Sequence, residues 1–530
     1  MRNWSAEVMC SLLVLCNSRT AHPRCRPQGW YMSMPSYDST RSIPAARHTL
    51  RLGGLWMSQR RGYRRRPGDV VLRRVRLQPE RIRARPQRRI RITPRAWMVV
   101  VLFALVMLFG GLLLHMPFSS ASGERVPFLD ALFTSVSAVS VTGLTRFDTE
   151  ETFSHVGEFI TLALFQLGGL GVTIYAGVLI VLAGQRLGIR GRAFFGLELM
   201  TTGVDGSGAS VLLRRVMVYT TIIEFTTFIL LLPWFMIEQP GDISLGRAVW
   251  LAGYHAISAF NNAGFDLMGG SRSFAGQAHD GWPMVVMGIS AFLGSLSFLT
   301  LFNLRQPRRR WTLDTKLVIT GMAGLLVVGM AFFLIADWSR LFADQSVGSK
   351  LVNSLFLSVN RTTGMTTAPL NQASDDTSLA MIIMMFIGGA STSTASGIKI
   401  GSFMVVTFGV VSALIGSARV VAFGREIPAS VVLRANALVL IALSGYVFGL
   451  LFFIAVDPHI DVLPAAFDVM SALANCGWSQ GASQAATQAG ANILIMMMFV
   501  GRLGPLVIAS LIPDRPRERF RFPTEAVRIG

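Results

Sequence analysis

Long apolar stretches separated by shorter semi-polar ones make up most of this chain. From about residue 96 the order is a long apolar stretch, a semi-polar stretch, and a second long apolar stretch, repeated four times. The first stretches lie near 97–115, 213–236, 316–336 and 431–456, and the second near 156–184, 282–303, 379–411 and 489–511. About 20 helical residues span the roughly 30 Å hydrocarbon core of a bilayer. The pattern therefore predicts an all-α membrane protein with eight transmembrane helices.

The semi-polar stretches share one design. Each holds about ten small and apolar residues, enough for a half-membrane helix, and then reaches a glycine. These glycines are Gly143, Gly264, Gly364 and Gly477. Their similar placement indicates four copies of one helix–re-entrant segment–helix unit. We place the repeats at 87–192, 193–310, 311–425 and 426–511, followed by a C-terminal segment at 512–530.

Charge predicts the orientation of these units. Of all residues, 52% are hydrophobic and only 15% charged, which excludes an ordinary water-soluble protein. The four between-span segments hold 16 acidic and 7 basic residues, whereas arginine clusters occupy the opposite flanks. Positive flanks stay in the cytoplasm. We therefore expect a multi-pass protein of the cell (inner) membrane with both termini cytoplasmic and the four semi-polar segments on the outer side.

The N-terminal tail carries most of the net charge of +20. Residues 1–96 hold 22 arginines and four acids, and the composition of residues 1–86 predicts a disordered cytoplasmic segment. Such a tail attracts anionic lipid headgroups. The alternatives are an exaggerated cytoplasmic flank or a mis-called start, with the true start at Met57. We expect no nucleic-acid binding, because aromatic residues are scarce near the arginines.

The repeated glycine suits a cation pathway. An ion that leaves water needs oxygens at short range to replace its hydration shell, and backbone carbonyls hold it less tightly than carboxylates. Aiming successive carbonyls inward needs unusual backbone angles, which glycine adopts without a Cβ penalty. A single glycine of this kind is typical of helix packing. Four in equivalent loops predict a cation selectivity filter.

The loop motifs resemble the Trk/Ktr/HKT superfamily of potassium transporters. "SVSAVSVTGL" is similar to the first pore loop of that family, "HAISAFNNAGF" to the second, "VNRTTGMTT" to the third and, most loosely, "SALANCGW" to the fourth. The resemblance implies four repeats around one central pore. It also implies these filter residues: Val141, Thr142, Gly143, Leu144, Asn262, Ala263, Gly264, Phe265, Thr362, Thr363, Gly364, Met365, Asn475, Cys476, Gly477 and Trp478.

The resemblance also implies an ion and partners. Glycine at all four positions is similar to the potassium-selective members, whereas serine at the first marks sodium-preferring plant relatives. K⁺ would then be the transported ion and the only metal, held in the filter, with no cofactor in this chain. The family implies a homodimer on a cytosolic ring of RCK/KTN-type regulatory subunits that bind a nucleotide (ATP/ADP or NAD). Sodium dependence or sodium passage stays open.

A gate is predicted in the second span of the third repeat. Small and hydroxyl residues interrupt the apolar run "MIIMMFIGGASTSTASGIKIGSFMVV", so the helix is expected to break and line the pore. The stretch resembles the intramembrane gating loop of the family, with Thr392 and Ser396 at usual glycine positions. The motif "GRLGPL" in the last span, together with the ending "RFRFPTEAVRIG", is similar to the Ktr branch. The predicted gate residues are Gly388, Gly389, Ser391, Thr392, Ser393, Thr394, Ser396, Gly397, Lys399 and, from the last span, Arg502.

Four further polar residues have weaker assignments. Glu224 is expected to hydrogen-bond or ion-pair between helices, and Arg361 to hold filter carbonyls. Glu158 is expected at the membrane interface, and His255 in a structural role. A packing face of small residues is the alternative for the gate, and capping of loop carbonyls is a compatible role for Arg502.

Two other classes of function fit less well. An intramembrane enzyme needs convergent His, Asp or Ser groups at one depth, and the sequence offers no catalytic cluster. A secondary carrier usually has inverted repeats and a midplane site of broken helices, whereas these four repeats share one orientation. We therefore predict potassium uptake through a channel-like pore, with a carrier as the alternative.

Overall fold

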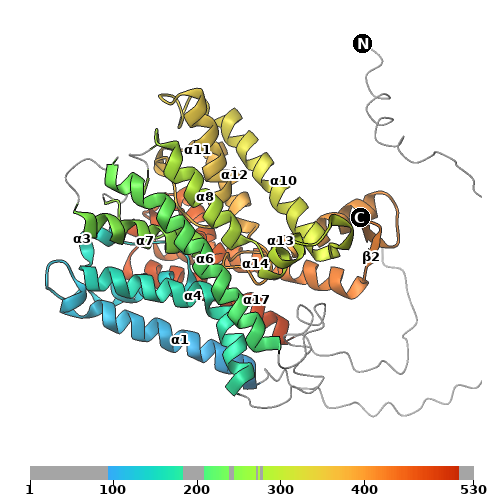
Figure 1. The fold of residues 1–530 in the computed structure, drawn as a ribbon, viewed down its shortest axis with the longest axis horizontal. Helices are drawn as coiled ribbons and strands as arrows, with labels where there is room; N and C mark the ends of the chain where they lie inside the picture. Colours follow the sequence, from blue (N-terminus) through green and yellow to red (C-terminus); the bar gives the residue numbers. More distant parts are fainter. Residues whose placement is uncertain (1–93, 183–207, 238–243, 270–272, 275–277, 512–530) are drawn as a thin grey trace, which may run out of the picture. The chain divides into compact units, whose positions relative to one another are not determined.

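The structure is a computed structural model that describes residues 94–182, 208–237, 244–269, 273–274 and 278–511. All of them belong to the unit that begins at Arg85. The described part is almost entirely helical (Figure 1). The arginine-rich tail, the loop at 183–207 and the C-terminal segment 512–530 lie outside the described residues, and so do the predictions made for them.

Six of the eight predicted long stretches form continuous helices. These are α1 (Pro94–His115), α4 (His155–Leu182), α6 (Gly208–Ile237), α10 (Leu313–Ala336), α14 (Ala429–Val456) and α17 (Gln488–Leu511). By length and composition, three helices in the described part could cross a membrane, within α6, α10 and α14, and a bent pair, α8 and α9, makes a fourth. These helices expose large apolar side chains such as Phe225 and Phe448, as helices that face lipid do.

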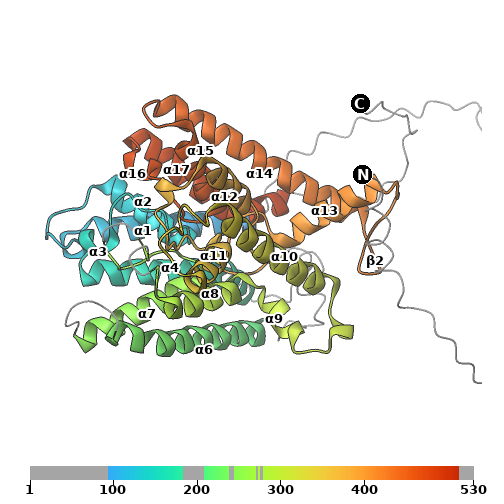
Figure 2. The same cartoon turned by 90° about the horizontal axis from the view of Figure 1, so that it is seen from above.

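Each semi-polar segment contains one short, largely buried helix. These helices are α2 (Phe128–Ser140), α7 (Leu245–Asn261), α11 (Val347–Asn360) and α15 (Val462–Ala474). Each packs on the long helix that precedes it, as α6 and α7 show in Figure 2. Five single-turn helices lie in the connections: η1 (Pro117–Ser119), α3 (Thr149–Thr152), η4 (Arg308–Arg310), η5 (Leu370–Gln372) and α16 (Ala482–Ala485).

The predicted continuous span at 282–303 is wrong. The chain forms α8 (Gly281–Ser295) and α9 (Phe298–Leu304), which meet at an angle of 101°. Leu296 is extended, and the Ser297 hydroxyl caps α9 by accepting from a backbone N–H of its first turn. Apolar length alone did not reveal the bend, because serine occurs inside many membrane helices as well as at their caps.

The second span of the third repeat breaks, and its loop fills the bend of the second. Here α12 (Asp375–Phe386) and α13 (Ile400–Leu414) are separated by residues 387–399, which we call the 387–399 loop. The carbonyl of Gly294 accepts from the N–H of Thr394 (3.1 Å), and that of Ser295 from Ala390 (2.9 Å). Carbonyls released where α8 ends are therefore paired with the loop, as a low-dielectric interior requires.

A two-stranded hairpin departs from the predicted all-α class. Strands β1 (Val420–Ala422) and β2 (Arg425–Ile427) pair antiparallel between α13 and α14. Phe423 and Gly424 at the turn both have positive φ, 50° and 74°. A two-residue turn of this kind usually carries Asn-Gly or Asp-Gly. With phenylalanine in the first position, the sequence lacks the usual hairpin signal.

Candidate ion-conduction site

The short helices end in one recurring backbone turn. Helices α2, α7 and α15 stop at a left-handed residue, namely Val141, Asn262 and Asn475, with φ of 58°, 56° and 50°. This conformation is uncommon for any residue but glycine, and especially so for a β-branched one. Helix α11 differs, because the residue that caps its end, Arg361, stays right-handed. The fourth stretch, the loosest match of the sequence, thus follows the same turn as the first two.

Each helix end leads within a few residues to a glycine with positive φ. The values are 87° for Gly143, 72° for Gly264, 85° for Gly364 and 102° for Gly477. We call the stretches around them glycine loops 1 to 4. Their bounds are Val141–Leu144, Asn262–Phe265, Thr362–Met365 and Asn475–Trp478. The backbone angles alone require glycine here, since other residues are strained in this region.

The four glycine loops contact one another in a closed ring. A Cβ built on Gly143 or Gly364 would lie 2.6 Å from the carbonyl oxygen of Ala263 or Cys476 in the next loop. A Cβ on Gly264 or Gly477 would lie even closer to the carbonyl oxygens of Thr363 and Thr142. The order of contact is therefore loop 1 to 2, 2 to 3, 3 to 4 and 4 back to 1. Equivalent backbone carbonyls thus face the neighbouring glycine around the whole ring.

Asparagine side chains join neighbouring glycine loops by hydrogen bonds. The amide of Asn475 donates to the hydroxyl of Thr142 at 2.8 Å, which joins loop 4 to loop 1. The side-chain oxygen of Asn262 accepts from the hydroxyls of Thr362 (3.0 Å) and Thr363 (2.8 Å), which joins loop 2 to loop 3. These groups are buried, so losing one partner leaves a costly unpaired polar atom.

Polar residues on two of the short helices hold the chain that follows glycine loops 2 and 4. Ser258 donates to the carbonyl of Phe265 at 2.7 Å. His255 accepts from the backbone N–H of Leu267 at 3.3 Å. The buried carboxylate of Asp468 accepts from the N–H of Gln480 at 2.8 Å and from two further donors. The predicted structural role of His255 is confirmed, whereas sequence reasoning missed Asp468, although an acid within a small, apolar helix was a signal.

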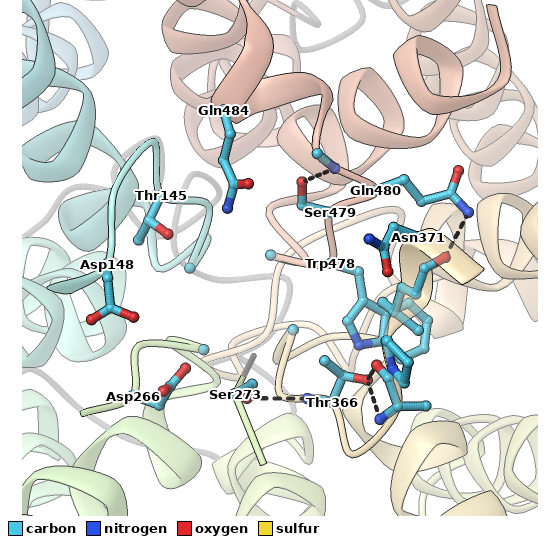
Figure 3. A pocket seen from close by; sticks show the side chains of 18 of the residues that line it. Thr145, Asp148, Asp266, Ser273, Thr366, Asn371, Trp478, Ser479, Gln480 and Gln484 are labelled. Atoms are coloured by element: carbon cyan, nitrogen blue, oxygen red, sulfur yellow. Dashed lines mark hydrogen bonds between the residues drawn. The ribbon is translucent and has the colours of Figure 1, made fainter. Parts of the chain in front are cut away.

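A cavity of about 550 Å³, which we call the vestibule, opens onto the ring (Figure 3). All four loop glycines line it, together with polar side chains from the segments that follow. Asp148 and Asp266 lie on one side of it, and Trp478 and Asn371 on the other. Two carboxylates beside a ring of carbonyl oxygens attract cations. Sequence reasoning counted these acids only in the charge balance and did not assign them to the site.

The 387–399 loop has a fixed backbone path. The N–H of Gly388 donates to the carbonyl of Ile398 at 2.8 Å, and any side chain on Gly388 would collide with the carbonyl of Ser396. Thr392 is left-handed, with φ of 58°, at a position that suits glycine. The ammonium of Lys399 donates to the carbonyl of Ala395 at 2.7 Å. The loop is therefore compact and internally hydrogen-bonded rather than an extended connection.

Arg502 of α17 ties this loop to α4. Its guanidinium donates to the carbonyl of Thr394 (2.9 Å), the hydroxyl of Ser396 (2.6 Å) and the carbonyl of Gly168 (2.7 Å). The side chain is 8% exposed. An arginine remains charged in proteins, so this arrangement places a buried positive charge against the loop. The capping role that the sequence suggested for Arg502 is confirmed.

In the described part of the chain, no cluster of three or more His, Cys, Asp and Glu side chains could hold a metal ion. The oxygens that converge come from backbone carbonyls, hydroxyls and the two vestibule carboxylates. Weak, neutral oxygen ligands suit monovalent cations that must leave again. Apart from the two carboxylates, the oxygens here are therefore of this weakly binding, neutral kind.

Residues 90–305 and again 300–515 match the family model of TrkH, described as a cation transport protein. The chain belongs to the TrkH family. The potassium/sodium uptake protein NtpJ of Enterococcus hirae is 31% identical over 440 residues, which cover 81% of this chain and 95% of that protein. The Ktr system potassium uptake protein B of Bacillus subtilis is 30% identical over 447 residues, which cover 83% and 98%.

The fold is similar to that of a solved TrkH-family structure. The crystal structure of the potassium transporter TrkH from Vibrio parahaemolyticus superposes with a TM-score of 0.61 at 19% identity, over 79% of this chain and 84% of that one. The resemblance read from the loop motifs is thus confirmed. The chain is a Trk/Ktr-type membrane subunit, and the family consists of cation transporters.

Three other assignments have mixed outcomes. Glu224 accepts from Gln166 (3.3 Å) and Asn261 (3.1 Å), so its role in hydrogen bonding between helices is confirmed. Arg361 donates to the carbonyl of Ile387 at 2.6 Å, at the start of the 387–399 loop, and not to a glycine-loop carbonyl as expected. The right-handed end of α11 directs it there.

Glu158 is more than an interfacial residue, because it belongs to a buried ion pair that the sequence did not reveal. Its side chain is 2% exposed and pairs with Arg247 at 3.0 Å. The indole N–H of Trp250 donates to the same carboxylate. A helix-end position in the sequence indicated only its depth, whereas the partners come from α7, almost 90 residues later. A carboxylate without those partners could not stay buried.

Proposed function

We propose that this chain takes up K⁺ through the ring of glycine loops, which acts as its selectivity filter. Cation transport follows from membership of the family. The observation that carries the finer proposal is the closed ring, in which each loop glycine lies against a carbonyl of the next loop. Four loops give four carbonyls in a layer, and such a layer can replace the hydration shell of a cation.

The choice of K⁺ rests on the four glycines and on two relatives. The Bacillus subtilis relative is a potassium uptake protein by name, and the Enterococcus hirae relative a potassium/sodium uptake protein. Sodium dependence or passage is therefore the second candidate within the same site. A secondary carrier is the more distant alternative, because the ring is continuous and involves all four loops in equivalent contacts.

The rest of the proposal concerns gating and assembly. The 387–399 loop is the gate, closed by the positive charges of Lys399 and Arg502 and by the bonds that Arg502 makes to it. The proposal includes eight crossings in four repeats, with both termini in the cytoplasm and the vestibule on the outer side. The name "Ktr system" of two relatives supports a multicomponent assembly. We propose a homodimer on a ring of nucleotide-binding RCK/KTN-type subunits.

Substituting Gly143→Ser tests the filter and the ion together. The new Cβ would lie 2.6 Å from the carbonyl of Ala263, on a residue with φ of 87°. Displacing that carbonyl should lower rubidium influx about tenfold and raise sodium influx in cells that lack their own potassium uptake, with the regulatory subunits co-expressed. Each tenfold corresponds to about 1.4 kcal/mol. An unchanged rubidium-to-sodium ratio in membrane-inserted protein, or no rubidium influx from the native chain, would contradict the proposal.

External pH should change uptake through Asp266. Burial, aided by the charges of Asp148 and Glu150, raises the pKa of this vestibule carboxyl to about 6. The group is then mostly ionised at pH 7.5 and mostly protonated at pH 5.5, so acidification removes one negative charge from the cation entrance. We expect the KM for rubidium to rise roughly two- to threefold between these values. Asp266→Asn should show the higher KM at both, and an unaltered pH profile in that variant would exclude Asp266 as the cause.

A further inference from the structure

We propose that Asn262 couples the position of the 387–399 loop to glycine loop 3, so that the state of the gate sets how well the ring discriminates between cations. The inference rests on the proposed roles of the ring as filter and of the 387–399 loop as gate. It concerns one side chain that touches both. No other asparagine in the ring shares this pair of contacts among the described residues.

Asn262 uses both ends of its amide. Its oxygen accepts from the hydroxyls of Thr362 (3.0 Å) and Thr363 (2.8 Å). Its nitrogen donates to the hydroxyl of Thr394 in the 387–399 loop at 2.9 Å, and to the carbonyl of Ala291 at 3.2 Å. The side chain is fully buried. A planar amide cannot move one end without the other, so a displacement of Thr394 changes the acceptor that the loop 3 threonines share.

Thr394 is the point at which the gate meets the ring. Its buried hydroxyl accepts from Asn262 and donates toward the carbonyls of Gly294 (2.8 Å) and Phe260 (3.0 Å). Its own carbonyl accepts from Arg502 at 2.9 Å. A movement of the loop that separates Thr394 from Arg502 therefore also strains the hydrogen bond between Thr394 and Asn262. The same movement disturbs the hydrogen bond from Thr394 to the carbonyl of Phe260, which lies two residues before Asn262.

Glycine loop 3 depends more than the other loops on side chains of neighbouring segments to hold its backbone in place. Helix α11 ends without the left-handed cap that turns the other three short helices into their loops. Its C-cap residue, Arg361, donates to the carbonyl of Ile387 and not to a glycine-loop carbonyl. The Thr362 and Thr363 hydroxyls donate to Asn262, and the Thr363 carbonyl faces Gly264. Moving Asn262 therefore shifts one of the four ring carbonyls.

Asn475 provides the matched control. It occupies the equivalent position two residues before its glycine, is left-handed, and is fully buried like Asn262. Its amide donates to a ring hydroxyl, that of Thr142 (2.8 Å), and to the carbonyl of Met498 on α17 (2.9 Å). It thus matches Asn262 in position, backbone conformation and burial, and its amide nitrogen also bonds a neighbouring segment, but it makes no bond to the 387–399 loop and its side-chain oxygen has no hydrogen-bond partner in the described part of the chain.

The test is a double-mutant cycle on the rubidium-to-sodium uptake ratio. Asn262→Gly removes the amide and tolerates the left-handed backbone, and Thr394→Val removes the hydroxyl at nearly constant volume. The full chain is reconstituted in vesicles with each change and with both. We expect each single variant to lower the ratio about fivefold, as for one buried hydrogen bond. The double variant should also lie near fivefold, because both changes break the same connection.

Control combinations decide between coupling and general damage. Asn475→Gly combined with Thr394→Val should multiply the two single effects, since these residues share no contact. Thr394→Ser, which keeps the hydroxyl, should retain the native ratio. If Asn262→Gly gives no uptake, Asn262→Asp keeps the acceptor oxygen, removes the donor, and enters the same cycle. Multiplying effects for Asn262 and Thr394 in a conducting protein would overturn the coupling, whereas absence of native rubidium uptake would overturn the proposed function itself.

Discussion

Gly264→Ala is expected to reduce rubidium uptake at least 30-fold while the protein still inserts in the membrane. A Cβ at this position would approach the carbonyl of Thr363 more closely than van der Waals contact allows, and the neighbouring atom is backbone. With φ of 72°, alanine is also strained by about 1–2 kcal/mol. The ring must open at its contact between loops 2 and 3, and a rearrangement of about 2 kcal/mol in the conducting state accounts for the loss.

Gly123→Ala separates backbone strain from the contact in the ring. Gly123 has nearly the same φ, 74°, but a Cβ there meets no atom within 4 Å. This variant should pay the same conformational cost and retain uptake within about twofold. Initial rates of rubidium influx, normalised to protein in the membrane fraction, give the comparison. Equal losses in both variants would mean that strain alone, and not closure of the ring, explains the sensitivity of Gly264.

The sequence predicted the parts of this fold that depend on local composition. Apolar length gave the six continuous long helices, and small residues before each glycine gave the four short ones. The four glycines could be found because the reason for each, positive φ and a neighbouring carbonyl, is the same in every repeat. A requirement of the backbone leaves a direct trace in the sequence, since only one residue type meets it at low cost.

Features that depend on partners distant in the chain could not be predicted. The bend between α8 and α9 is stabilised by the 387–399 loop, about 100 residues later, because N–H groups of that loop donate to the carbonyls freed at the end of α8. Glu158 is buried because Arg247 lies beside it, and Arg361 turns from the ring because its helix ends right-handed. In each case a residue's environment was decided by tertiary contacts and not by its neighbours in sequence.

The two broken spans show how a membrane protein can place irregular backbone at depth. The loop that separates α12 from α13 supplies N–H groups to the end of α8, and several of its own carbonyls are paired within the loop or with Arg361 and Arg502. Hydrogen bonds between the two breaks therefore pair backbone groups that each break leaves free, which lowers the cost of unpaired polar groups in a low-dielectric region.

Arg502→Gln should raise rubidium influx through the chain alone, without regulatory subunits, by roughly 30-fold. The native guanidinium holds the 387–399 loop at the Thr394 carbonyl and the Ser396 hydroxyl, and it adds a positive charge beside the proposed conduction path. For any two unit charges of like sign, a separation of about 8 Å at an effective dielectric constant of about 20 would give a repulsion of about 2 kcal/mol, and a barrier of this order accounts for the expected effect. Glutamine retains a donor for the loop but removes this barrier.

Arg361→Gln is the matched variant, because Arg361 is also a buried arginine that donates to a carbonyl at the 387–399 loop, that of Ile387. It does not bond the segment from Thr394 to Ser396, so its loss should lower thermal stability without raising basal influx. Rubidium influx into vesicles loaded with potassium gives the basal rate of each of the two variants. If Arg502→Gln conducts no faster than the native chain, or if the two variants raise influx equally, then Arg502 supports the loop only as a structural cap. The closed state would then have to be maintained elsewhere along the path.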